Sequence, residues 1–439
     1  MAIKISVIGT NYLGATTAAG LAEFGFDVVG VDIDEARVKV LGSGRAPLYE
    51  PGLDELLRKH TDSGRLRFTT DYREVADWAQ VFFICVGTPQ GAHGAADLSQ
   101  VQAVVDTLAP LLTGPALVVG RSTVPVGTAA WIGRRFAERT GDLPGLEVAW
   151  QPEFLREAHA VEDTLHPDRL VFGVCSESAE RTLREIFARP IDEGSPVIVT
   201  DRETAELVKA AANSFLAMKI SYINALAGLC ETVGADVSTL ADALGHDKRI
   251  GRGSLSAGPG YGGGCLPKDL HAFTARAEEL GSTELGGLLR QVDLINSARQ
   301  ARIVGVLAEA LEGGLEGKAI AVLGAAFKAE TDDIRESPAL SVAELIRARG
   351  AAVTLFDPQA MENARRAFPL ITYADSAVDA CVGAHAVVHL TDWPQFRELD
   401  PRALREVVAN PVLIDARLSL DLDAWSEAGW ACHPRTAKA

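Results

Sequence analysis

The chain has 439 residues, more than one hydrophobic core usually organises, so two or three domains are expected. Hydrophobic residues make up 47% of it and charged residues 23%, which is typical of a folded globular protein. The formal net charge of -17 disfavours nucleic acid and anionic membranes as partners, because both are bound through basic surfaces. Residues 1–10 favour a strand over a secretory signal, and no apolar run is long enough to cross a bilayer.

The cysteines have neither the density of a disulfide framework nor the spacing of metal ligands. They are Cys85, Cys175, Cys230, Cys265, Cys381 and Cys432. This pattern predicts a cytoplasmic protein without a metal site.

Short β-rich runs alternate with helical stretches, which predicts an α/β fold with parallel sheets. Strands are expected at residues 3–9, 26–34, 81–87, 116–122 and 146–150, and again at 318–324, 351–357, 384–390 and 411–416. We therefore expect two Rossmann-like doubly wound domains joined by a central long-helix region. The predicted domains are 1–200, 201–300 and 301–439.

Residues 201–234 predict one long helix with an apolar stripe, because apolar side chains recur every three or four residues. The stripe comprises Leu207, Ala211, Phe215, Met218, Tyr222, Leu226, Leu229 and Val233. We interpret it as a packing surface, and the sequence leaves open whether its partner is the same chain or a second subunit. A long helix between two α/β halves suits a dimer core.

The first predicted strand runs into a glycine turn and then a helix, which is the context of a dinucleotide phosphate site. Gly9 and Gly14 frame the turn, and the second strand ends at Asp32. A carboxylate there accepts hydrogen bonds from the adenosine ribose and disfavours a 2′-phosphate, so NAD is favoured over NADP. Arg37 weakens that preference slightly, and Asn11 replaces the usual middle glycine with a residue that tolerates left-handed geometry. The alternative is a glycine-rich turn without a ligand.

Cys265 follows three glycines and precedes Pro267 and Lys268, where a helix N-terminus and a cation favour a thiolate. A thiolate attacks an aldehyde, and oxidation of the adduct gives a thioester that water hydrolyses. Lys209 and Asn213 lie one helical turn apart and away from the apolar stripe, where they are able to stabilise an oxyanion. The alternatives are an inert thiol and a solvated helix face.

Thr123 follows an apolar strand, at the edge of a parallel sheet where ligands bind. Glu153 and Glu157 are candidates for the same cleft, one to position substrate and one to assist water. Such carboxylates are otherwise surface charges.

Nine segments resemble the UDP-glucose/GDP-mannose dehydrogenase family, in the family's order and over nearly the whole chain. They are VIGTNYLG, VDID, FICVGTP, STVPVGT, PEFLRE, LVKAAANSFLAMKISYIN, GPGYGGGCLPKD, FKAETDDIRESP and TDWPQF. The resemblance implies an NAD-binding domain, a central dimerisation region and a C-terminal nucleotide-sugar domain, in a homodimer or a higher homo-oligomer. It also implies oxidation of a nucleotide-sugar alcohol to a carboxylate.

The resemblance also implies roles for individual residues. Cys265 is the nucleophile. Lys209, Asn213 and Asp269 stabilise the alkoxide and the oxyanion and transfer the proton. Thr123 and Glu157 position the water molecule. The implied NAD contacts are Gly9, Leu13, Gly14, Asp32, Arg37, Thr88, Thr123, Glu157, Lys268 and Arg335. The implied substrate contacts are Glu153, Phe154, Leu155, Arg156, Glu157, Lys209, Asn213, Ser254, Leu255, Ser256, Ala257, Gly258, Gly262 and Lys328, with Arg249 reaching the substrate of a partner subunit.

Four positions depart from the family pattern: Asn11, Gly264 in place of a serine, and Gln151 and Ala158 in place of Asn and Gly. None removes a proposed catalytic group. Residues 249–269 resemble the UDP-glucose branch more than the GDP-mannose branch, and the Pro-Lys-Asp after Cys265 disfavours a UDP-N-acetylhexosamine. Two rivals remain: a two-electron hydroxyacid-type dehydrogenase, and an inactive nucleotide-sugar-binding protein.

Overall fold

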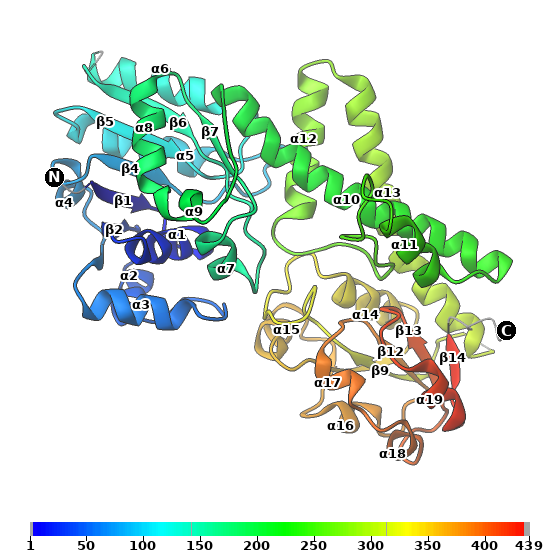
Figure 1. Ribbon diagram of the computed structural model, residues 1–439. Coiled ribbons are helices and arrows are strands. Elements are labelled where there is room, and N and C mark those ends of the chain that lie inside the picture. The colour runs from blue at the N-terminus through cyan, green and yellow to red at the C-terminus, as the bar shows by residue number, and fades with distance from the viewer. Residues whose placement is uncertain (1–2, 142, 313, 434–439) are drawn as a thin grey trace. The chain divides into compact units, whose positions relative to one another are not determined.

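A computed structural model describes residues 3–141, 143–312 and 314–433. The chain divides into two compact units (Figure 1). Unit 1 comprises Met1–Ala212 and His271–Leu280, and unit 2 comprises Asn213–Leu270 and Gly281–Ala439. Each unit is described by itself below.

Unit 1 contains an eight-stranded sheet of order β3-β2-β1-β4-β5-β6-β7-β8 among its described residues. Its strands are β1 (Lys4–Ile8), β2 (Asp27–Val31), β3 (Leu66–Thr69), β4 (Val81–Ile84), β5 (Ala116–Gly120), β6 (Leu146–Trp150), β7 (Leu170–Gly173) and β8 (Val197–Thr200). Neighbouring strands are parallel except β6 and β7, which pair antiparallel at Trp150 and Gly173. The order 3-2-1-4-5-6 of the first six strands is that of a dinucleotide-binding Rossmann sheet.

Helices cover both faces of this sheet (Figure 1). They are α1 (Tyr12–Glu23), α2 (Glu35–Gly42), α3 (Leu53–Asp62), α4 (Arg73–Ala76), α5 (Ser99–Leu108), α6 (Thr128–Thr140), α7 (Ala160–Leu165), α8 (Glu177–Ile186) and α9 (Ala188–Asp192). Phe83 belongs to a core shared with α1, α3 and α8, whereas its neighbours Phe82 and Ile84 belong to a second core shared with α5 and α6. Successive side chains of a strand point to opposite faces of the sheet, and helices cover both faces, so both are buried.

Helix α10 (Arg202–Val233) is the predicted long helix, and its buried side carries polar as well as apolar side chains. Its polar residues Lys209 and Asn213 are only 5% and 7% exposed, so the interpretation of these two as a solvated helix face is wrong. The apolar stripe faces outward instead: Tyr222 is 55% exposed and Leu229 58%. The stripe is therefore not covered by the described residues of the same chain.

Unit 2 combines helices with a second sheet. Helix α11 (Val237–Gly245), the first residues of α12 (Leu266–Glu279) and helix α13 (Thr283–Ala310) precede it in the chain, and the rest of α12 belongs to unit 1. The sheet has the order β11-β10-β9-β12-β13-β14 among the described residues, and all its pairs are parallel. Its strands are β9 (Ala319–Leu323), β10 (Ala352–Phe356), β11 (Thr372–Tyr373), β12 (Ala386–His389), β13 (Val412–Asp415) and β14 (Ala431–His433).

The helices of the second sheet are α14 (Pro338–Ala348), α15 (Met361–Ala367), α16 (Ala377–Cys381), α17 (Pro394–Arg397), α18 (Pro401–Arg405) and α19 (Leu422–Glu427). The predicted fold class, with two Rossmann-like sheets and a long helix between them in the chain, is confirmed. Within the described ranges, no helix is long and apolar enough to span a membrane.

Candidate active site

The two glycines of the turn after β1 lie where a side chain would not fit. Gly9 has φ +85°, and a Cβ on Gly14 would lie 1.7 Å from the carbonyl oxygen of Gly9. Asn11 precedes α1 with φ −71° and ψ −159°, which any residue adopts, so its tolerance of left-handed geometry is not needed. The close approach of Gly9 and Gly14 leaves the N-terminus of α1 open to a pyrophosphate, as a dinucleotide site requires.

Asp32, just beyond β2, is 5% exposed and is held by neighbouring donors. The Thr10 amide donates to its Oδ2 over 2.7 Å, and the Arg37 guanidinium pairs with its Oδ1 over 2.9 Å. Burial opposes ionisation most, yet the hydrogen bonds from the Thr10 and Asp34 amides and from Arg37 together keep the pKa of Asp32 below its usual value. The carboxylate is thus ionised and fixed where a ribose would be bound.

Thr123 lies in the segment after β5, and its position is fixed through its backbone. The Thr88 hydroxyl donates to the carbonyl oxygen of Thr123 over 2.7 Å, and the Ser122 hydroxyl donates to the carbonyl oxygen of Val86 over 2.7 Å. The structure therefore brings together Thr88 and Thr123, two residues that the sequence placed at the same site.

Lys209 on α10 forms an ion pair with Glu153, with 3.0 Å between Nζ and Oε1. Both side chains are nearly buried, at 7% and 11% exposure, and the ammonium lies 5.8 Å from the centre of the Phe154 ring. The amide of Leu155 donates to the other Glu153 oxygen over 2.5 Å. A buried charge needs such a partner, so Glu153 fixes the Lys209 ammonium in place.

The segment that follows Glu157 is strained at Ala158, which has φ +68° at a position where the family usually has Gly. Glu50 offsets this strain with two hydrogen bonds, accepting from the amides of Ala158 and Ala160 over 2.8 and 2.7 Å. The Tyr12 hydroxyl of α1 donates to the same carboxylate over 2.6 Å. Glu50 therefore ties the proposed substrate loop to the start of the dinucleotide helix.

In unit 2, Cys265 lies at the start of α12. Its carbonyl oxygen accepts the first helical hydrogen bond, from the amide of Asp269 over 2.9 Å, and its side chain is exposed. The helix begins at Leu266 with Pro267 in its first turn, as the sequence predicted. A thiol at this position faces the positive end of the helix dipole and is accessible to a substrate.

Asp269 is the centre of a buried polar cluster beside this cysteine. Its Oδ2 accepts a hydrogen bond from Asn213 Nδ2 over 2.6 Å, and its Oδ1 accepts one from Lys268 Nζ over 2.6 Å. Asp269 is 3% exposed and Asn213 7%. The structure thus brings together three predicted site residues from α10 and α12.

The glycine-rich segment before Cys265 is packed too tightly for side chains. A Cβ on Gly260, which has φ +115°, would lie 2.4 Å from Asn296 Oδ1, and one on Gly262 would lie 2.2 Å from the carbonyl oxygen of Glu336. The Asn296 side chain also accepts from the amide of Tyr261 over 2.8 Å. These contacts hold the loop as a rigid support for Cys265.

Gly264 gives space to Arg335. A Cβ on Gly264 would lie 2.2 Å from Arg335 Cζ, so the serine that the family commonly has cannot fit here without displacing the guanidinium. Asp333 holds the same guanidinium through Nε at 2.9 Å, and the Arg335 carbonyl accepts from the amide of Gly263 over 2.9 Å. This chain therefore places Arg335 against the residue that precedes Cys265.

Two further predicted residues contact neighbours in the chain. Arg249 is 89% exposed and pairs with Asp247 over 2.6 Å. Lys328 lies 5.7 Å from the ring of its neighbour Phe327. Sequence reasoning missed Glu50 and also Glu206, whose position one turn before Lys209 on α10 was the available signal.

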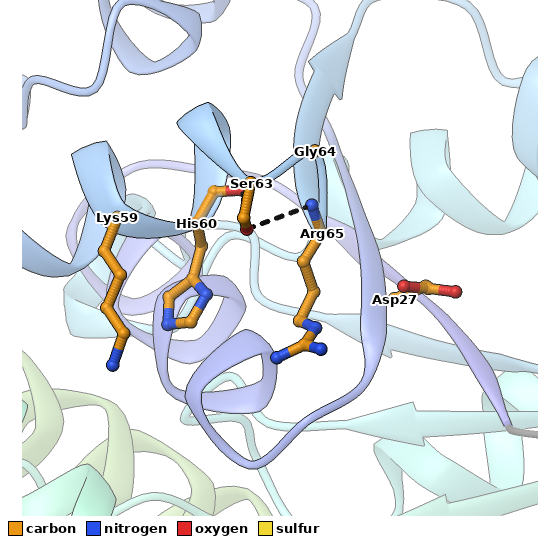
Figure 2. Close-up of a pocket in the computed structure, with 6 residues that line it drawn as sticks. All are labelled: Asp27, Lys59, His60, Ser63, Gly64 and Arg65. Carbon is orange, nitrogen blue, oxygen red and sulfur yellow. Dashed lines mark hydrogen bonds between the residues drawn. The ribbon is translucent and has the colours of Figure 1, made fainter.

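A basic pocket elsewhere in unit 1 is not part of the candidate site. Figure 2 shows Lys59, His60 and Arg65 around it, with Ser63 and Gly64 at the turn between them. Asp27, which also lines it, is the first residue of β2, whereas the candidate cofactor residue Asp32 follows the last residue of that strand. The pocket thus lies at the opposite edge of the sheet from the dinucleotide turn.

Comparison with known proteins identifies the chain. Residues 3–191, 203–298 and 321–422 match the NAD binding, central and UDP binding domains of the UDP-glucose/GDP-mannose dehydrogenase family. The chain belongs to this family. The resemblance seen in the sequence, the cofactor NAD and the dehydrogenase class are thereby confirmed.

Individual relatives match over almost their whole length. UDP-glucose 6-dehydrogenase YwqF of Bacillus subtilis is 40% identical, over 97% of this chain and 96% of its own. A solved UDP-glucose dehydrogenase from Pyrobaculum islandicum is 38% identical, with a TM-score of 0.90 over 98% of both chains. A UDP-D-ManNAc dehydrogenase from Pyrococcus horikoshii is 30% identical, with a TM-score of 0.87 over 98% of both chains.

The packing of Arg335 on Gly264 yields a prediction. Gly264→Ala should fold normally, because only the end of a flexible side chain has to move, but KM for NAD should rise about tenfold if Arg335 contacts the cofactor. Gly253→Ala is the matched control, since a Cβ there meets nothing within 4 Å. Steady-state kinetics with varied NAD measure the effect, and equal KM values for both variants would contradict the proposed role of Arg335.

Proposed function

We propose that this chain oxidises UDP-glucose to UDP-glucuronate with two NAD, through a thioester on Cys265. The observation that carries the proposal is the exposed Cys265 at the start of α12, beside Asp269, which Asn213 and Lys268 hold in place. The substrate is inferred from relatives named UDP-glucose 6-dehydrogenase that cover nearly the whole chain.

The oxidation begins at the primary alcohol of the sugar. Lys209, fixed by Glu153, and Asn213, one turn further along α10, stabilise the negative charge that develops on the substrate oxygen. Asp269 accepts the alcohol proton, directly or through a water molecule. NAD, when held by the turn at Gly9 and by Asp32, supplies the chemistry of hydride acceptance in each of two successive oxidations.

The Cys265 thiolate then forms a bond to the aldehyde carbon and gives a thiohemiacetal, whose oxygen takes a proton or is stabilised by Lys209 and Asn213. Loss of a second hydride converts this adduct to a thioester. Thr123 and Glu157 position a water molecule, which adds to the acyl carbon and releases the Cys265 thiolate and the carboxylate. In balance, the alcohol, two NAD and one water give the carboxylate, two NADH and three protons.

Covalent catalysis by a cysteine separates this proposal from two of its three rivals. A GDP-mannose or other nucleotide-sugar 6-dehydrogenase shares the mechanism and differs only in substrate. A two-electron hydroxyacid-type dehydrogenase has no use for Cys265, and an inactive nucleotide-sugar-binding protein makes no NADH.

The stoichiometry of the reaction tests the proposal. Two NADH should form per UDP-glucose consumed, because alcohol and aldehyde are oxidised before the product leaves. Absorbance at the NADH band against a limiting amount of UDP-glucose measures this, with GDP-mannose and UDP-N-acetylglucosamine as parallel substrates. One NADH per substrate supports the two-electron rival, and none with any of the three supports the binding protein.

Cys265→Ser tests the covalent step in the same assay. The variant should keep its fold and NAD binding and release UDP-glucuronate at less than about 1% of the parent rate, because an alcohol is a far weaker nucleophile than a thiolate. Cys175→Ser replaces another exposed cysteine and serves as the control. Release of UDP-glucuronate at the parent rate by Cys265→Ser would refute covalent catalysis.

We also infer that the chain functions as a homodimer, in the cytoplasm as its scattered cysteines suggest. The support is the apolar stripe of α10, on which Phe215, Tyr222, Leu229 and Val233 are all more than half exposed. A row of large apolar side chains on one helix face marks an interaction surface, and a second copy of the same stripe is self-complementary about a two-fold axis.

A charge on the stripe tests the dimer. Leu229→Glu should shift the molar mass measured by light scattering toward that of one chain, because an unpaired carboxylate would be buried at the interface. Leu370→Glu introduces the same change at a leucine that is 71% exposed in unit 2, and it should leave the molar mass unchanged. A dimer that persists in Leu229→Glu would exclude the stripe as its core.

A further inference from the structure

Glu206 has a buried carboxylate to which the proposed mechanism gives no role. It lies on α10, three residues before Lys209, and is 2% exposed. Its Oε2 accepts from the amide of Gly127 over 2.7 Å, and its Oε1 accepts from the amide of Ala129 over 2.6 Å. Both amides belong to the turn that opens α6, so one side chain occupies the N-terminus of a second helix.

The turn held by Glu206 ends the segment that carries Thr123. That segment is anchored at its start by the hydroxyls of Ser122 and Thr88, and further along Arg276 of α12 donates from Nη2 to the carbonyl oxygen of Val126 over 2.9 Å. Glu206 is therefore the contact that joins the far end of this segment to α10. The same helix turn that fixes the segment also carries Lys209.

We propose that Glu206 is a positioning residue for the dehydrogenase reaction: it locks the turn at residues 127–129 to α10 and thereby fixes Thr123 relative to Lys209. This inference rests on the proposed function, which gives Thr123 and Lys209 their roles. Glu206 itself touches neither cofactor nor substrate in this account. It acts on the position of Thr123 through its hydrogen bonds with the two backbone amides.

The lock depends on the charge of the carboxylate. An ionised carboxylate accepts from both amides, whereas a protonated one presents a hydroxyl to one of them and loses that contact. Burial raises the pKa of Glu206 from 4.5 to about 7, against the two amides, which favour the ionised form. The facing charges are Arg202, which favours ionisation, Glu203, which opposes it, Lys209 on the same helix and Arg276 at Val126.

The sign of the effect follows from that raised pKa. The lock forms as the pH rises through about 7 and is released as the pH falls through 7. Because the folded-state pKa exceeds the unfolded value, the contribution of Glu206 to stability is full below pH 4.5 and decreases as the pH rises through 7. Positioning and stability thus change in opposite directions with pH.

Glu206→Gln tests the proposal, because an amide also accepts from only one of the two N–H groups. The variant should lower kcat about tenfold above pH 8, with KM values within about threefold, since small misplacements of catalytic groups act on turnover. The ratio of wild-type to variant kcat should fall toward one below pH 6, where the wild-type carboxyl is protonated. Taking the ratio cancels ionisations that both proteins share.

Glu203→Gln is the matched control, because it removes an exposed carboxylate from the same turn of α10 and should stay within about twofold of wild type. A ratio for Glu206→Gln that is constant from pH 6 to 9, or equal to one throughout, would overturn the proposal. A wild type that makes no NADH with any nucleotide sugar would refute the proposed function instead.

Hydrogen exchange on the wild-type protein gives a second measurement that needs no variant. After correction for intrinsic rates, the amides of Gly127 and Ala129 should become more protected as the pH rises from 6 to 8. Unchanged protection over this range would show that the carboxylate does not lock the turn, whatever the activity of Glu206→Gln.

Discussion

Burial of the polar face of α10 is the constraint on which the candidate site depends. An ordinary helix of a globular protein buries its apolar face, whereas this helix buries Glu206, Lys209 and Asn213 together with apolar residues such as Ile223, and it exposes Tyr222 and Leu229. Each buried polar group must find a partner, because an unpaired one would cost several kcal/mol. The partners are the amides that open α6, the Glu153 carboxylate and the Asp269 carboxylate, and each belongs to a different part of the site.

This requirement accounts for the pairings that α10 makes within each compact unit. A single turn of α10 fixes the segment of Thr123 through Glu206 and the substrate loop through Glu153. The next turn holds Asp269 through Asn213, four residues after Cys265. The glycines before Cys265 then become necessary, because side chains there would collide with Asn296 and Glu336. The site segments are thus positioned by pairs of buried polar groups and by glycines at places where a side chain would collide.

The sequence predicted most of the fold, and the roles of the site residues stay predictions. Strand alternation, the turn at Gly9 and the helix from residue 201 to 234 follow from local patterns, and the structure has all of them. Periodicity also located the stripe of α10, but it assigns apolar faces to packing and cannot tell which side of a helix is covered. The burial of Lys209 and Asn213 was therefore not predictable from spacing alone.

Other features depend on contacts between residues far apart in the chain. In the sequence alone, Glu206 resembles any carboxylate on a helix, and only the structure shows its hydrogen bonds with the amides of Gly127 and Ala129. In the same way, only the structure shows that Arg335 occupies the space beside Gly264. Ala158, with φ +68°, is tolerated where the family has Gly because Glu50 holds the amides at 158 and 160, a pairing across more than a hundred residues. No local pattern encodes such pairings.

The central claim is that a sulfur at the start of α12 carries the substrate as a thioester, and trapping that ester tests it most directly. Glu157→Gln should slow hydrolysis, so rapid acid quenching followed by peptide mass spectrometry should find a UDP-glucuronyl group on the peptide that contains Cys265, and hydroxylamine should release it. A single turnover that produces two NADH without any acyl group on that peptide would contradict the account.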